Sequence, residues 1–108
     1  MERILRFTVK GQLIEKDPSC DFTGLTPGTN GYLTAEFNFS REWDGCAKVV
    51  GFRSGNNEYE PQVLRDGRFC TIDEEVLKRP MFYIHVVGKK GDYRIKTGEV
   101  LVKQTGGT

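Results

Sequence analysis

Side-chain catalysis usually needs a nucleophile, a base and a group that orients the base, and this sequence offers few candidates for them. Its only histidine is His85, which lies inside an apolar run and would have to serve any Ser–His or Cys–His mechanism. Its three cysteines, Cys20, Cys46 and Cys70, are widely spaced, whereas zinc ligands usually come in pairs roughly two to four residues apart. We therefore expect no catalytic residue, no metal site and no cofactor, and thiols that stay reduced and pack as small apolar groups.

Other patterns with chemical potential are better explained by folding. The acidic run Asp73-Glu74-Glu75 is typical of a helix start, where carboxylates are stabilised by the exposed N–H groups. The chain has 13 glycines, but none falls in a GxGxxG or GxxxxGK pattern, so they are expected to serve as turn residues.

Composition excludes several classes of protein. Sixteen Lys and Arg against 15 Asp and Glu give a net charge of +1 over 108 residues, which predicts no nucleic-acid partner. No apolar run approaches the roughly 20 residues that span a bilayer, so we expect no membrane partner. The N-terminal segment MERILRFTVKGQ carries charges within its apolar stretch, which argues against a signal peptide and for synthesis in a cytoplasm.

The elements that would position any site are predicted to be strands, because apolar and polar residues alternate. The clearest case is 31–40, where Leu33, Ala35, Phe37 and Phe39 alternate with polar residues. Residues 4–11 and 81–88 follow the same rule. Weaker candidates lie at 46–53, 61–64, 68–72 and 93–104, and the last is interrupted at Thr97-Gly98, which indicates a bulge or a bend.

Turn signals separate these runs, at 26–31, 43–45, 54–57, 65–67 and 89–92. Asp66-Gly67 is predicted to form a hairpin tip between 61–64 and 68–72. The one helical signal is a short turn near 73–78, which Asp73 would cap and Pro80 would end. We therefore predict a single all-β domain over residues 1–108: an antiparallel β-sandwich, immunoglobulin-like or jelly-roll-like, of about seven or eight short strands.

The aromatic residues divide between the core and the surface. Most phenylalanines fall on the inward phase of their strands, whereas Tyr59, Tyr83 and Tyr93 are expected at the surface. Tyrosine suits a position that is half buried and half wet, as at a protein interface. Such a surface would also suit a sugar, and a carbohydrate-binding module stays open as an alternative.

The order of motifs resembles the small β-sandwich domains of phage virion proteins, in particular the N-terminal domain of baseplate upper proteins and related tail-fibre or minor structural proteins. The resemblance covers roughly residues 32 to 104. The first motif, F-x-F-S-x-x-W-x-G-x-x-K-x-x-x-F, is filled by Phe37, Phe39, Ser40, Trp43, Gly45, Lys48 and Phe52. The second, D-G-x-C-x-I-P-x-E-V-L, is filled by Asp66, Gly67, Cys70, Ile72, Glu75, Val76 and Leu77, with Asp73 in place of the proline. The closing motif is matched loosely by Gly91, Ile95, Thr97 and Val102.

The resemblance implies a non-enzymatic structural protein of a phage capsid, neck, tail or baseplate. Such a protein would be made in the bacterial cytoplasm and would attach to, or decorate, the particle by docking to other phage proteins and to its own copies. Longer baseplate proteins carry receptor-binding regions after this domain, so only the attachment role is expected here.

Within this interpretation the motif residues are expected to determine the fold. Trp43 would cover one open end of the sandwich and Gly45 would permit the turn that follows. The residues assigned this role are Phe37, Phe39, Trp43, Gly45, Phe52 and Gly67.

A different function stays open beside the structural one. The chain would then be a small phage counter-defence or regulatory protein that binds a host protein or a signalling nucleotide, so a small-molecule ligand is not excluded. Basic residues in or near predicted loops would provide contacts if they converge. They are Arg65, Arg68, Lys89, Lys90 and Arg94.

Overall fold

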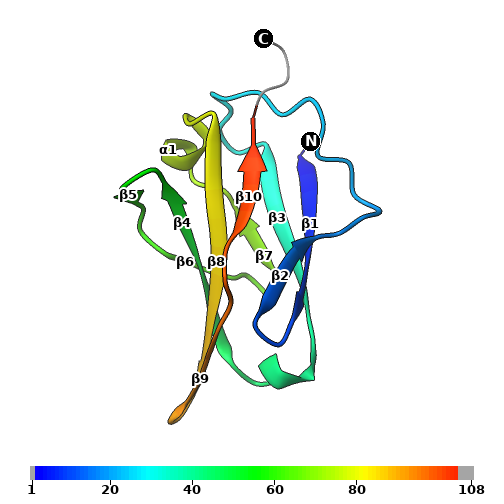
Figure 1. Cartoon of the computed structure of the whole chain (residues 1–108), viewed down its shortest axis with the longest axis vertical. Coiled ribbons are helices and arrows are strands. Elements are labelled where there is room, and N and C mark those ends of the chain that lie inside the picture. Colours follow the sequence, from blue (N-terminus) through cyan, green and yellow to red (C-terminus); the bar gives the residue numbers. More distant parts are fainter. Residues whose placement is uncertain (1, 105–108) are drawn as a thin grey trace.

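A computed structural model describes residues 2–104 of the chain, and in this part it has ten strands and two short helices (Figure 1). The first strands are β1 (Arg3–Lys10), β2 (Leu13–Lys16), β3 (Leu33–Phe39), β4 (Ala47–Ser54) and β5 (Asn57–Glu58). The later ones are β6 (Gln62–Val63), β7 (Phe69–Thr71), β8 (Met81–Lys90), β9 (Tyr93–Lys96) and β10 (Val100–Lys103). A 3-10 helix, η1, spans Arg41–Trp43, and α1 spans Glu74–Leu77.

The strands form two sheets that enclose one apolar core, which confirms the predicted all-β sandwich-like fold. The β1–β3 sheet has the order β2-β1-β3-β7, and the β4–β8 sheet has the order β10-β8-β4-β5, with β6 also paired to β4 and β9 to β8. Alternation places one face of each strand inside, where aromatic rings meet. Phe7 and Phe37 stack with ring centroids 5.4 Å apart, and Phe52 and Phe82 meet edge to face at 6.1 Å.

One pairing departs from the antiparallel prediction. β1 and β3 run parallel, with Phe7 opposite Phe37. A parallel pair needs a long connection, since the chain must return to the end at which the first strand began. The short strand β2 and residues 17–32 make this connection, and the loop closes the sandwich by packing Phe22 against Phe7 and burying Leu25.

The tip at Asp66-Gly67 forms as predicted, but it does not join two strands of one hairpin. Asp66 and Gly67 both have positive φ angles, 53° and 67°. However, β6 pairs with β4 whereas β7 pairs with β3, so the turn carries the chain from one sheet to the other. Gln62 bridges this crossing, because its amide nitrogen donates to the Thr71 carbonyl at 2.8 Å and its amide oxygen accepts from the Asp73 N–H at 3.1 Å.

The other local predictions can be compared directly. Helix α1 lies within the expected 73–78, and Asp73 occupies its N-cap position without a side-chain capping bond. The interruption at Thr97-Gly98 is a bulge, because residues 97–99 lie opposite only two residues of β8, His85 and Val86. The hairpin of β8 and β9 turns at 91–92 and projects at the bottom of Figure 1. Strands β2 and β5 were not predicted.

Candidate functional site

A groove opens where the end of β3, the start of β4 and the 65–68 turn meet. Its volume is about 350 Å³. Both sequence motifs contribute to it, the first through β3 and β4 and the second through the turn. The lining residues are Phe37, Asn38, Phe39, Lys48, Asp66, Gly67 and Arg68.

The groove exists because β7 covers only part of β3. The two strands pair from Thr34 to Glu36, and Phe37 then donates its N–H to the Arg68 carbonyl at 2.9 Å. Beyond this bond the 65–68 turn leads the chain away. Within residues 2–104, no strand pairs with Asn38 or Phe39 on this side, so the last part of β3 is an open strand edge.

Lys48 forms one wall of the groove and covers an aromatic ring. Its ammonium nitrogen lies 5.1 Å from the centroid of Phe39 and donates to the Cys46 carbonyl at 3.2 Å. The ammonium also lies 3.7 Å from the position that a Cβ at Gly67 would occupy, so the turn and the lysine approach closely. Lys48 is thus a positive charge held over an apolar surface at the open edge.

The ring of Phe39 packs against the ring of Trp43. The two ring centroids lie 5.1 Å apart. Trp43 is fully buried, and its indole N–H donates to the Gly11 carbonyl at 2.8 Å. The tryptophan therefore closes this end of the sandwich from the inside, as expected for a corner residue, and it is not an exposed interface anchor.

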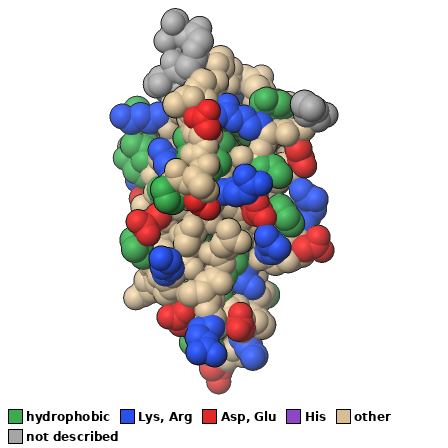
Figure 2. Space-filling view, turned by 90° about the vertical axis from the view of Figure 1, so that its right-hand side faces the viewer, with side chains coloured by type: hydrophobic (Ala, Val, Ile, Leu, Met, Phe, Trp, Pro, Cys, Tyr) green, Lys and Arg blue, Asp and Glu red, His purple; other side chains and the backbone are tan. Residues whose placement is uncertain are grey.

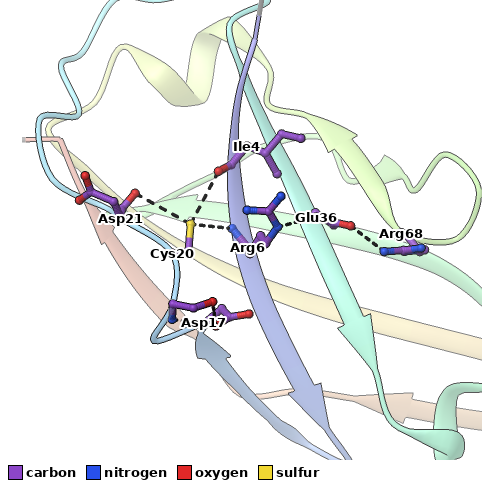
Figure 3. Close-up of polar contacts among 8 residues, drawn as sticks. Ile4, Arg6, Asp17, Cys20, Asp21, Glu36 and Arg68 are labelled. Carbon is purple, nitrogen blue, oxygen red and sulfur yellow. Dashed lines mark hydrogen bonds and ion pairs between the residues drawn. The ribbon is translucent and has the colours of Figure 1, made fainter.

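A second charged feature adjoins the groove on the outer face of the β1–β3 sheet (Figure 3). The carboxylate of Glu36 accepts from Arg68 at 2.6 Å and from Arg6 at 3.0 Å, and Glu36 is only 8% exposed. One carboxylate thus holds two half-exposed guanidinium groups, which leaves one positive charge in excess. This pair of contacts fixes the position of Arg68 at the rim of the groove.

Cys20 lies beside this cluster, where the 17–32 loop meets β1 (Figure 3). Its sulfur accepts from the Arg6 N–H at 3.3 Å and donates to the Ile4 carbonyl at 3.7 Å. Asp17 and Asp21 stabilise the same loop. Asp17 accepts from the N–H and hydroxyl of Ser19, Asp21 accepts from the hydroxyl and N–H of Thr23, and these bonds lower the pKa of both carboxyl groups. The cysteine is thus a packing residue of the loop.

The histidine and the three cysteines do not line the groove. His85 lies away from the groove, on the outer face of the β4–β8 sheet, where its ring covers Gly51. Burial raises the pKa of the Cys70 thiol to about 12, so it is protonated at neutral pH and is a poor nucleophile. Within residues 2–104, no group of three or more His, Cys, Asp or Glu side chains is placed to hold a metal ion.

The contact residues predicted from the sequence do not form one site. Arg68 lines the groove, and Arg65 lies beside it, with its guanidinium 3.4 Å from the Thr71 hydroxyl. Tyr83 lies on the outer face of the β4–β8 sheet, and Tyr59 lines a depression there. Arg94 lies on β9.

Tyr93 also lies on β9, where it is 46% exposed and donates its hydroxyl to the Glu42 carbonyl at 2.8 Å. The sequence left open whether Arg65 and Arg68 converge with Lys89, Lys90 and Arg94. The first two are at the 65–68 turn, whereas the others are in the β8–β9 hairpin.

The depression around His85 has a volume of about 190 Å³. The charged side chains at its rim sum to zero, because Arg53 and Lys96 carry positive charges and Glu58 and Glu99 carry negative ones. Burial lowers the pKa of His85, and the nearby Lys96 lowers it further. The imidazole is therefore mostly neutral at pH 7.

Two features of the groove were not predicted from the sequence. The open edge at the end of β3 depends on where β7 stops pairing, which no local pattern reveals. The position of Lys48, however, could have been predicted from the sequence. Lys48 alternates with Val50 and Phe52 on the inward-facing side of β4, and a lysine on that side must lie at an open end of the core.

The residues assigned to the fold occupy positions consistent with that role. Phe37 and Phe52 are buried, Gly45 has a φ of 74°, and Gly67 shapes the groove turn. That they determine the fold stays a prediction.

On the face shown in Figure 2, Lys and Arg side chains are interspersed with Asp and Glu, without a continuous region of one sign. None of the described helices is long and apolar enough to cross a membrane. No family model matches the chain, and comparison with curated proteins and with solved structures found no significant match.

Proposed function

We propose that this protein is a non-enzymatic structural component of a phage particle, and that it attaches to other phage proteins through the groove between β3 and the 65–68 turn. The motif order supports the phage assignment. The observation that carries the docking role is the open edge of β3, which is flanked by Lys48 and by Arg68.

An open strand edge offers main-chain N–H and carbonyl groups to an incoming extended segment, which adds as a further strand. Here the segment would pair with the part of β3 beyond Phe37, where β7 no longer pairs. Lys48 and Arg68 would then face its side chains, and an acidic segment would gain charge-assisted hydrogen bonds from them. The expected partner is therefore an extended acidic stretch of a neighbouring virion protein.

The proposal is tested by particle incorporation. Phage particles assembled with the wild-type chain are purified and examined by mass spectrometry and electron microscopy, and absence of the protein from them would contradict the phage role. Lys48→Glu places a like charge against the acidic segment, so we expect at least about a tenfold loss of incorporation, equivalent to about 1.4 kcal/mol. The matched control is Lys10→Glu, an exposed reversal on β1.

If particles contained the Lys48→Glu variant at the wild-type level, the groove would not be the docking site, although the phage role would still stand. A thermal melt of each variant separates a docking defect from unfolding, since Lys48 also covers Phe39.

A second candidate function is favoured by the depression around His85, a half-buried imidazole in a small cavity. It would suit a regulatory or counter-defence protein with a small ligand. The balanced rim gives little support to a phosphate ligand such as a nucleotide, because Glu58 and Glu99 would repel it. Calorimetric titration with nucleotides tests this function, and heat of binding would favour it over the structural one.

The carbohydrate alternative has less support than the structural role. A sugar platform needs a free aromatic face, and the guanidinium of Arg53 lies 4.4 Å from the centroid of Tyr83 and covers it. A glycan array that gave binding abolished by Tyr83→Ala would still favour this alternative.

A further inference from the structure

The outer face of the β4–β8 sheet carries a row of valines that no described element covers. Val63 lies opposite Val49, and Val49 lies opposite Val87, so the three side chains cross β6, β4 and β8 in one line. Val63 is 75% exposed, and the other two are half-buried. Apolar side chains that line up across neighbouring strands and stay open to water are typical of a binding surface.

On one side of the valine row lies the next outward-facing row, which holds Ala47, Lys89 and Arg94. On the other side the charges are largely neutralised. Two rows further along the sheet, Arg53 lies opposite Tyr83 and is held by both carboxylate oxygens of Glu99 at 2.9 Å. Between them lies the Gly51–His85 row, where the neutral imidazole covers the glycine. The centre of the face therefore presents valines, one aromatic ring and a closed ion pair, which can be desolvated at low cost.

The two edges of this face carry opposite charges. On the β5 side, Glu58 lies opposite Arg53, and Glu60 follows in the loop to β6. On the β9–β10 side, Lys96 lies opposite Val87 and Lys103 lies opposite Met81. All four charged side chains are exposed or half-exposed.

We propose that a second copy of the chain packs on this face, related by a twofold axis that runs parallel to the strands between β4 and β8. This rotation places Val49 over Val87 of the partner subunit, and it brings the acidic edge of each copy over the basic edge of the other. Sheets packed face to face in this way lie about 10 Å apart with strands within about 30° of each other. The interface is isologous, as in most twofold dimers.

Charge explains why the occupant is a second copy. A partner of uniform charge would be attracted at one edge and repelled at the other, whereas the twofold copy is complementary at both. Four strands spaced about 4.8 Å apart, over roughly 27 Å of their length, give about 500 Å² per copy. The total of about 1,000 Å² is at the lower limit of specific interfaces, so the dimer should dissociate on dilution.

The dimer would form whether or not the protein attaches to a phage particle. The valine row and the groove lie on different surfaces, because the groove opens at the end of β3 and the row lies on the outer face of the other sheet. A symmetric dimer would carry two grooves and double the number of contacts with a repetitive particle.

The test is solution mass by sedimentation or light scattering across a dilution series. We expect a dimer that becomes monomeric on dilution, and a midpoint that moves at least about tenfold to higher concentration in Val49→Glu. Lys48→Glu and Lys10→Glu are the controls, and neither should change the mass. If Lys48→Glu lost particle incorporation but kept the dimer, the two proposals would be separated.

Charge reversal tests the same face without altering its apolar row. Glu58→Lys and Lys103→Glu should each weaken the dimer, and the double variant should restore it, because the twofold axis brings the two edges together. A monomer at every concentration up to ~1 mM would overturn the proposal. So would a dimer that Val49→Glu and both charge reversals leave unchanged.

Discussion

The ring of Trp43 packs directly against the backbone of Gly88 on β8. A Cβ at residue 88 would lie 2.7 Å from Cε3 of Trp43 and 2.8 Å from Cζ3, closer than real Cβ contacts come. The ring itself is fully buried and contacts Phe39 on its other side. The absence of a side chain at residue 88 of β8 therefore makes space for Trp43, the largest fully buried side chain among the described residues.

Gly88→Ala should destabilise the protein although alanine normally suits a strand better than glycine. The methyl group has no free space, and overpacking of this kind costs about 1–3 kcal/mol. A domain of this size loses roughly 4–8 °C in melting temperature per kcal/mol. Thermal melts followed by circular dichroism measure the loss, and fluorescence of the single tryptophan reports whether the ring has moved.

Gly98→Ala is the matched control for this prediction. A Cβ at residue 98 would meet nothing within 4 Å, and no positive φ restricts the position. We expect its melting temperature to stay within a few degrees of wild type. Equal losses in the two variants would show that glycine flexibility, and not the space for Trp43, is what matters.

Trp43→Phe should cost stability even though the phenyl ring fits the apolar space. The substitution removes the indole N–H of the fully buried Trp43, which donates to the partly buried Gly11 carbonyl at 2.8 Å, and loss of such a hydrogen-bond partner costs about 1–3 kcal/mol. Trp43→Ala should cost about 3–5 kcal/mol. Urea unfolding followed by circular dichroism gives the free energies.

Tyr93→Phe serves as the comparison for Trp43→Phe, since it also removes one hydrogen bond to a carbonyl, that of Glu42, but at a 46% exposed residue. Water can replace this bond, so the loss should be small. A Trp43→Phe variant as stable as wild type would contradict the role of Trp43 as a fold determinant.

The alternation of apolar and polar residues predicted the main strands of the fold, because each of these strands has one buried face and one face toward solvent. Phe37 and Phe82 show this directly, since both point into the core as expected. The parallel pairing of β1 with β3 was not predicted, because alternation indicates which face of a strand is buried and not which neighbour it has. The short strand β5 was missed because two residues are too few to show a period.

Of the residues that line the groove, the sequence indicated only Arg68 as a possible contact residue, and the arrangement of the groove was not predicted. Asp66-Gly67 was correctly placed at a tight turn, yet the turn joins two sheets, since Val63 pairs with Val49 on one and Cys70 pairs with Ala35 on the other. The groove depends on this crossing. Such long-range pairing is decided by core packing, which a local pattern does not contain.

Cys70 should be the last thiol to react and should make the protein less stable at high pH. Burial raises its pKa from 9.0 to about 12. The unfolded chain therefore releases the thiol proton between pH 9 and 12, whereas the folded chain keeps it. Stability from this group is complete below pH 9 and declines as pH rises toward 12, with a slope of up to about 1.4 kcal/mol per pH unit.

Two measurements check this prediction. Labelling with a thiol reagent under native conditions should modify the partly exposed Cys20 well before the buried Cys46 and Cys70. Urea unfolding at several values between pH 8 and 11 should show a smaller loss of stability in Cys70→Ala than in wild type. Early labelling of Cys70, or equal losses, would contradict the assigned burial.

His85 gives a pH-dependent signal that a single resonance can report, because it is the only histidine. Burial lowers its pKa below the usual 6.5, and Lys96 lowers it further, while Glu99 and Glu58 oppose the shift. Arg53 also lines the depression around His85, with its charge paired to Glu99. The unfolded chain takes up a proton first as pH falls, so this group's contribution to stability is complete above 6.5 and declines below it.

Gly51→Ala tests the cause of this shift, because a Cβ at residue 51 would lie 2.2 Å from Cε1 of His85 and must push the ring outward. We expect a proton NMR titration to give a pKa below 6.5 in the wild type and a value closer to 6.5 in the variant. The proposed dimer would cover His85 and lower its pKa further, so the wild-type value should rise on dilution. A pKa above 6.5 in the wild type, or one that Gly51→Ala leaves unchanged, would show that contact with Gly51 does not control the protonation of this imidazole.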